Sequence, residues 1–233
     1  MKGSPVSPEV LDRVTTPRGE LVLRRVDGEF EVISNGTFLM DTRDGRSERA
    51  LVRAALAAHR RPAAARTLVV GGLGVGFSLL EAVSDPDLER VVVVEIEPVL
   101  VSWHATQLAH LTGAALADPR VQVVVGDVAA HLAEHPGGYD VVCLDVDNGP
   151  DWTVTETNDA LYSADGLDRC VQALASAGVL AVWSARPAPR YADLLAGRLD
   201  DVQVIEVETS LGRGDPDVVF TGVRRPGLSP ATP

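Results

Sequence analysis

The chain has 233 residues, of which 45% are hydrophobic and 23% charged, and its formal net charge is −12. This is the composition of an ordinary globular protein, and the length suits one large α/β domain or one domain with a small appendage. The acidic balance argues against binding to nucleic acid or to an anionic membrane, because both partners require positive charge. The N-terminus has no apolar stretch typical of a signal peptide, and no segment is long enough for a membrane span. We therefore expect a cytoplasmic protein.

The N-terminal region reads as a small β structure. Residues 1–18 contain several prolines and predict an extended lead-in. Across residues 19–46, three short β-type runs are separated by Asp27-Gly28 and Asn35-Gly36. Both dipeptides tolerate positive φ and favour the tight turns of antiparallel hairpins. The sequence thus predicts a three-stranded meander, followed by an alanine-rich helix over residues 47–59.

From residue 67 onward, apolar strand-like runs alternate with helical segments. The expected strands cover residues 67–72, 90–97, 120–127, 139–147, 178–185, 202–209 and 217–224. The expected helices cover residues 77–85, 98–111, 128–135, 158–177 and 191–199. This alternation predicts a mostly parallel sheet buried on both faces, and the last two strands should form an antiparallel hairpin because no helix separates them. The fold class is α/β, with a seven-stranded sheet of the class I methyltransferase (Rossmann-like) type over residues 47–225 and a disordered tail over residues 226–233.

A glycine-rich turn follows the first of these strands. Gly71, Gly72, Gly74 and Gly76 lie between that strand and a helix, where glycines let the backbone approach a ligand. A tight strand-to-helix turn explains the same residues equally well. Glu95 strengthens the binding interpretation, because an acid about 20 positions after such a turn, at the end of the next strand, hydrogen-bonds ribose hydroxyls.

Acids also end the next two strands. Asp127 ends the third strand and Asp145 the fourth, and the carboxyl ends of parallel strands share the edge where ligands bind. The pattern predicts an adenosyl sulfonium site, with Glu95 on the ribose, Asp127 near the adenine amino group, and Ile96 and Val128 beside these two acids. A dinucleotide dehydrogenase fits less well, since no hydride-transfer domain follows residue 150.

The stretch VVCLDVDNGPDW, residues 141–152, is the candidate catalytic segment. A carboxylate there can take the proton of an amine nucleophile and stabilise the developing cation, and we assign that role to Asp145. Asn148 could orient an acceptor without charge, and Tyr162 could reach it. The alternative is that the segment is only the polar turn in which a buried strand ends, and that Tyr162 is a core residue.

The chain resembles the spermidine synthase family of polyamine aminopropyltransferases from about residue 20 to residue 185. The resemblance rests on TLVVGGLGVG, VVVEIEPVLV, DPRVQVVVGDVAAHL and YDVVCLDVDNGP, followed in register by LYSADGLDRCVQALASAGVLAVW. It implies that Glu95 holds the ribose, that Asp127 contacts the adenine and that Asp145 receives the proton of the attacking amine. It also implies a small-molecule amine as acceptor and a homodimer as the assembly.

Three positions depart from the family pattern. Gly74 replaces the acid of the glycine turn, Asn148 replaces the second acid of an Asp-x-x-Asp pair, and Ser47 or Glu48 stands where the family has a Tyr before an acid. The missing groups help the family to bind cationic amines, so the departures affect the acceptor more than the fold or the nucleoside site.

The sequence therefore predicts a metal-independent transferase. The donor is S-adenosylmethionine or its decarboxylated form, and the acceptor is an amine. No histidine shows metal-ligand spacing with cysteine. Two alternatives stay open: a small-molecule methyltransferase using the same site, and a non-catalytic nucleoside-binding or dimerisation module.

Overall fold

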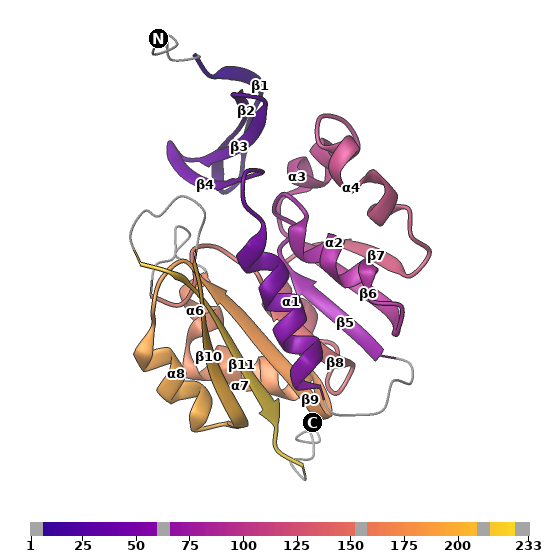
Figure 1. Ribbon diagram of the computed structural model, residues 1–233, viewed down its shortest axis with the longest axis vertical. Coiled ribbons are helices and arrows are strands. Elements are labelled where there is room, and N and C mark those ends of the chain that lie inside the picture. The colour runs from indigo at the N-terminus through magenta and orange to yellow at the C-terminus, as the bar shows by residue number, and fades with distance from the viewer. Residues whose placement is uncertain (1–6, 60–65, 152–157, 209–214, 227–233) are drawn as a thin grey trace. The chain divides into compact units, whose positions relative to one another are not determined.

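The computed structural model describes residues 7–59, 66–151, 158–208 and 215–226 (Figure 1). The chain divides into two compact units, Met1–Gly45 and Arg46–Pro233. The tail expected to be disordered, from residue 226, falls outside the described residues after Pro226. Within the described part of the chain, no helix is long and apolar enough to cross a membrane.

The first unit is a four-stranded antiparallel sheet in the order β1-β2-β3-β4. Its strands are β1 (Glu9–Thr16), β2 (Gly19–Val26), β3 (Glu29–Ser34) and β4 (Thr37–Asp41). The β2–β3 and β3–β4 turns are the dipeptides singled out in the sequence, and all four of their residues have positive φ. The sequence predicted three strands here. The fourth, β1, pairs with β2 where an extended lead-in was expected, and prolines border it at positions 8 and 17.

The second unit alternates helices and strands. The elements are α1 (Arg46–Ala58), β5 (Arg66–Gly71), α2 (Phe77–Ser84), β6 (Leu88–Glu95), α3 (Pro98–His104), α4 (Ala109–Leu116), β7 (Val121–Val125), α5 (Val128–Ala133), β8 (Tyr139–Leu144), α6 (Asp159–Tyr162), α7 (Ala164–Ala173), β9 (Leu174–Ser184), α8 (Pro189–Ala196), β10 (Leu199–Val207) and β11 (Asp217–Arg224).

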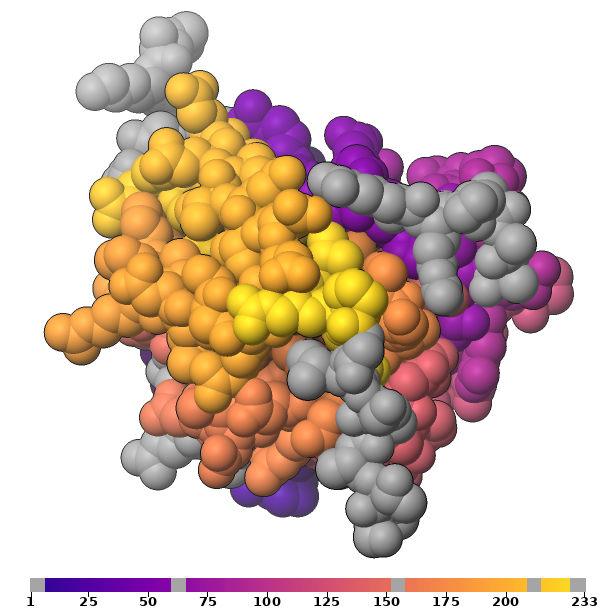
Figure 2. Space-filling model, turned by 90° about the horizontal axis from the view of Figure 1, so that it is seen from below, coloured from indigo at the N-terminus to yellow at the C-terminus, as the bar shows by residue number. Residues whose placement is uncertain are grey.

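These strands form one seven-stranded sheet in the order β10-β11-β9-β8-β5-β6-β7. Neighbours from β7 to β9 pair in parallel, whereas β11 is antiparallel to both β9 and β10. In the space-filling view of Figure 2, the orange and yellow C-terminal segments lie on one side of the molecule and magenta segments lie on the other. The predicted seven-stranded, mostly parallel sheet with an antiparallel edge hairpin is confirmed.

Each face of the sheet has its own apolar core. On one face the strands pack against α5, α6, α7 and α8, and on the other against α1, α2 and α4. Successive residues of a buried strand alternate between the two faces, so Cys143 belongs to the α1 and α2 side and Leu144 to the opposite side. Cys143 and Cys170 are both buried free thiols.

One predicted helix, over residues 98–111, is two helices in the structure. The hydroxyl of Thr106 donates to the carbonyl of Ser102 at 2.9 Å, and Leu108 N–H donates to Trp103 O at 2.8 Å. Such local bonds compete with the regular helical pattern and end α3. The break places α4 next to α2, beneath the glycine turn.

Candidate functional site

The glycine turn occupies the loop between β5 and α2. Gly72, Gly74 and Gly76 have φ values of 92°, 53° and 95°, a region that favours glycine. A Cβ on Gly72 would overlap the carbonyl oxygen of Asp145, and a Cβ on Gly76 would overlap the methyl group of Thr112. The turn therefore lies directly against the loop after β8, where the predicted catalytic acid stands.

Glu95, at the end of β6, is bonded to this turn. Its Oε2 accepts from Leu73 N–H at 2.9 Å, and its Oε1 accepts from Glu97 N–H at 2.8 Å. Burial raises the pKa of Glu95, and these backbone hydrogen bonds, with one from Gly74, oppose the rise. Each carboxylate oxygen has a second lone pair, so the same side chain can brace the turn and accept from ribose hydroxyls. The ribose role stays a prediction.

Asp127 stands at the N-terminus of α5. Its Oδ1 accepts from Ala130 N–H at 2.8 Å, which makes it the cap of that helix, and its side chain is exposed. The next residue, Val128, packs beneath the turn, since a Cβ on Gly71 would lie 2.9 Å from it. Ile96 is half-buried after Glu95. The adenine role of Asp127 and the donor contacts of Ile96 and Val128 stay predictions.

Asp145 follows β8 on the face covered by α1 and α2. Its Oδ2 accepts from the hydroxyl of Ser78 at 2.6 Å, and its N–H donates to Gly71 O at 2.8 Å. Burial raises its pKa to about 6, and the negative charges of Asp217 and Glu95 add to the rise, while the Ser78 hydrogen bond opposes it. A carboxylate with this pKa is ionised at neutral pH and can accept a proton.

Two further acids from other elements share an electrostatic environment with Asp145. Glu48 lies in the first turn of α1 and Asp217 begins β11. Burial first, and then the charges of Asp145 and Asp217, raise the pKa of Glu48 to about 8 in all. Three carboxylates from α1, from the loop after β8 and from β11 thus share one half-buried environment. We call Glu48, Asp145 and Asp217 the acid cluster. A cationic group is its natural complement.

The other two predicted catalytic residues have different surroundings. Asn148 is 7% exposed, and its side-chain N–H₂ group has no hydrogen-bond partner among the described residues. Tyr162 is buried on the opposite face, where its hydroxyl donates to Val146 O at 2.5 Å and its ring packs edge-on against Tyr191. Tyr162 therefore braces the loop after β8, and its direct contact with an acceptor stays a prediction, as does that of Asn148.

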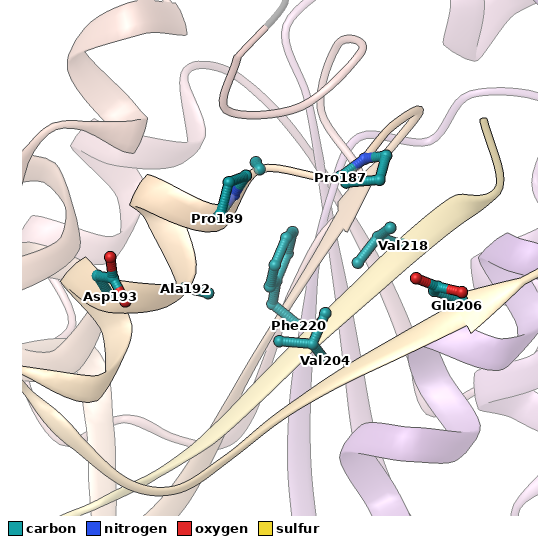
Figure 3. Close-up of a pocket in the computed structure, with 9 residues that line it drawn as sticks. Pro187, Pro189, Ala192, Asp193, Val204, Glu206, Val218 and Phe220 are labelled. Carbon is teal, nitrogen blue, oxygen red and sulfur yellow. The ribbon is translucent and has the colours of Figure 1, made fainter. Parts of the chain in front are cut away.

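A separate hollow lies between α8 and the β10–β11 hairpin (Figure 3). Its lining is mainly apolar, with Val204, Val218 and Phe220 from the strands, and carries two acids, Asp193 and Glu206. Val218 and Phe220 belong to the face opposite the acid cluster, so this hollow is not part of the candidate site. Within the described residues, no group of three or more His, Cys, Asp or Glu side chains is arranged to hold a metal ion.

Four residues of the site region were not predicted as site residues. The sequence gives no reason to place Ser78 in the site, yet its hydroxyl donates to Asp145. Glu48 had been noted only as a departure from the family pattern. Asp217 begins β11, and His104 ends α3 with its Nε2 2.9 Å from Gly74 O. Neither gave a local signal in the sequence, because their places depend on elements far away in the chain.

Comparison with known proteins gives a consistent family. Residues 46–191 match the spermine/spermidine synthase domain. Polyamine aminopropyltransferase 2 of Ralstonia nicotianae is 30% identical over 187 residues, which cover 78% of this chain and 35% of that protein. The polyamine aminopropyltransferase of Mycobacterium tuberculosis is 30% identical over 172 residues, covering 72% of this chain and 31% of that protein. The match thus spans about a third of the length of these relatives.

Solved structures agree on the fold. Spermidine synthase in complex with the transition-state analogue AdoDATO has a TM-score of 0.76 at 15% identity, covering 96% of this chain and 74% of that one. Human methyltransferase-like protein 13 in complex with SAH has a TM-score of 0.61 at 21% identity, covering 80% of this chain and 86% of that one.

Proposed function

Because the chain belongs to the spermine/spermidine synthase family, we propose that it transfers an alkyl group from an adenosyl sulfonium donor to an amine. The polyamine aminopropyltransferases among its relatives and the nucleoside analogues in the similar structures support this choice of donor and acceptor. The names of these relatives make aminopropyl transfer from decarboxylated S-adenosylmethionine the first reaction to assay.

One observation carries the proposal: the glycine turn and Asp145 touch. The Asp145 N–H donates to Gly71 O at 2.8 Å, and the Asp145 carbonyl occupies the space that a Cβ on Gly72 would need. A donor lying on the turn would therefore present its sulfonium end close to the one carboxylate held by Ser78. The turn and Asp145 are held together by main-chain contacts, and these support the proposal that a donor on the turn would lie next to the base.

The proposed chemistry needs one base and one electrophilic carbon. The amine lone pair attacks the carbon attached to the sulfonium, the carbon–sulfur bond breaks, and its electron pair stays on sulfur as a neutral thioether. The nitrogen then carries an extra proton, which Asp145 accepts. A positioned base of this kind contributes a factor of about 10² to 10⁴ to the rate.

The acid cluster is the proposed place for the acceptor. The family acid at position 148 is an amide here, but Glu48 and Asp217 supply carboxylates from α1 and β11. A cationic amine bound among them would relieve their mutual repulsion and favour the ionised form of Glu48. The acceptor class is therefore a cationic amine, with a diamine or polyamine as the first compounds to assay.

The decisive variant is Asp145→Asn, which keeps the shape and removes the base. We expect its turnover to fall by a factor on the order of 10² or more, with methylthioadenosine binding retained. The matched control is Asp193→Asn in the hollow on the opposite face, which should keep wild-type turnover. Full activity in Asp145→Asn would exclude Asp145 as the base.

Activity in the wild type should survive chelators, and its loss to them would indicate a metal.

Gly74 favours a second donor, S-adenosylmethionine. In the family the acid at this position attracts the ammonium of the decarboxylated donor and repels a carboxylate, and a glycine does neither. We expect S-adenosylmethionine to bind at least as well as its decarboxylated form, which would favour methyl or aminocarboxypropyl transfer. Titration of both donors decides this: a preference for the decarboxylated form above roughly tenfold, about 1.4 kcal/mol, contradicts it. Gly74→Asp should shift the preference toward the decarboxylated donor.

Assembly and location follow the family. We propose a homodimer acting in the cytoplasm, and sedimentation of the purified chain at several concentrations tests the dimer.

A further inference from the structure

The N–H groups of the glycine turn can be accounted for one by one, because a buried backbone donor needs an acceptor. Four of the five in residues 72–76 are bonded within the described part of the chain. The N–H of Gly72 donates to Val94 O, and that of Gly76 donates to Leu73 O. The N–H groups of Leu73 and Gly74 both donate to the carboxylate of Glu95. The fifth, Val75 N–H, has no partner among the described residues, although Val75 is only 4% exposed. Such a donor is available to an acceptor from water or from a ligand.

The orientation of that donor is set by His104. Its Nε2 lies 2.9 Å from Gly74 O, and its Nδ1 lies 2.6 Å from the hydroxyl oxygen of Thr112. A carbonyl can only accept, so Nε2 carries the proton and Nδ1 accepts from the hydroxyl of Thr112. His104 is 1% exposed, and burial lowers its pKa, which favours this neutral form.

The bond to Gly74 O fixes a whole peptide plane. The described residues contain no cis peptide bond, and in a trans peptide the C=O and the following N–H point in opposite directions. With Gly74 O held toward His104 on α3, Val75 N–H must point away from α3. Gly74, at a φ of 53°, has no side chain to hold the peptide in place, so the orientation depends on His104.

We propose that His104 is a positioning residue that turns Val75 N–H toward the tail of the donor, making the turn complementary to a tail that carries a carboxylate. The inference rests on the proposed nucleoside site and deepens it by naming the donor class, an S-adenosyl amino acid. Where the family has an acid, this turn offers a backbone donor, which attracts an anionic group and gives nothing to an ammonium.

Two substitutions separate the two contacts of the imidazole. In His104→Gln the side-chain amide reaches about as far as Nε2 and can still donate to Gly74 O. In His104→Asn it reaches only about as far as Nδ1, so the contact with Gly74 is lost while one with Thr112 remains. Thr112→Val keeps the shape under Gly76 and removes the hydroxyl that fixes the tautomer.

The assay is calorimetric binding of two nucleosides that differ in the tail. S-adenosylhomocysteine has the carboxylate and methylthioadenosine lacks it. For His104→Asn we expect S-adenosylhomocysteine to bind roughly tenfold or more weakly, the range for a lost hydrogen bond to a charged group. Methylthioadenosine should change less than about threefold. His104→Gln should restore most of the loss, and Thr112→Val should show the same selective loss to a smaller degree.

Several results would overturn the inference. Equal losses for both nucleosides in His104→Asn would indicate a merely structural role, and unchanged affinities would indicate none. If His104→Asn does not fold, Thr112→Val takes its place, and an equal loss for both nucleosides there has the same meaning. Wild-type protein that binds methylthioadenosine but not S-adenosylhomocysteine contradicts this inference alone, whereas failure to bind either removes the proposed nucleoside site as well.

Discussion

Replacing Glu48 with glutamine should remove a loss of folding stability that the wild-type protein suffers as the pH rises. The side chain lies in the first turn of α1, where burial and the charge of Asp145 raise its pKa from 4.5 to about 8. Asp145, with a pKa of about 6, loses its proton first, so its charge opposes the later ionisation of Glu48. Glutamine keeps the size of the side chain and cannot ionise.

The sign follows from the proton affinities of the two states. Between pH 4.5 and about 8 the folded protein retains the Glu48 proton while the unfolded chain has lost it, so stability falls as the pH rises through this window. The slope for one group is at most about 1.4 kcal/mol per pH unit. Because the side chain is half-buried and part of the shift comes from the charge of Asp145, we expect a total of about 2–3 kcal/mol, or roughly 4–10 °C in melting temperature.

The assay is denaturant unfolding of wild type and Glu48→Gln from pH 5 to pH 8.5. The two proteins should differ by less than about 0.5 kcal/mol at pH 5, and the variant should be the more stable by about 2–3 kcal/mol at pH 8. Glu89→Gln, at an exposed acid of the same unit, is the matched control and should show no such trend. A stability difference for Glu48→Gln that does not change with pH would refute the reasoning.

Three other outcomes test the site. Glu95→Ala should weaken methylthioadenosine binding by about 1–3 kcal/mol, measured by calorimetry, because charge-assisted hydrogen bonds are lost; unchanged affinity would remove the ribose from this strand end. Gly72→Ala should destabilise the protein by at least about 1–3 kcal/mol more than Gly137→Ala in denaturant unfolding, because both glycines have positive φ but only at Gly72 would a Cβ strike backbone. The kcat/KM of the wild type should fall as the pH drops through about 6, where Asp145 gains a proton; a flat acid limb would exclude it as the base.

The sequence by itself determined the layers of the fold. Apolar runs such as RVVVVEIE can only be buried on both faces, and their alternation with helices leaves a parallel sheet as the simple solution. Asp27-Gly28 and Asn35-Gly36 determined two turns by backbone chemistry alone. The sequence also determined that Glu95 and Asp145 lie at the same edge of the sheet, because the carboxyl ends of parallel strands meet there.

Strand β1 and the break between α3 and α4 needed the three-dimensional structure. The residues of β1 do not alternate strongly, and they become a strand because β2 offers them a partner edge. The predicted helix over residues 98–111 has a continuous helical pattern, and it is interrupted by the side-chain bond of Thr106 to Ser102 O and the backbone bond of Leu108 to Trp103 O.

Only the tertiary structure shows which residues make up the site. Ser78, Glu48 and Asp217 reach Asp145 from α2, α1 and β11, and His104 reaches Gly74 from α3. Nothing in the local sequence of these residues marks them, since each is an ordinary polar residue in its own element. Their roles arise from burial and from neighbours that are distant in the chain. Desolvation and the charges of neighbouring carboxylates set the pKa values of Glu48 and Asp145. The buried imidazole of His104 holds the carbonyl of Gly74.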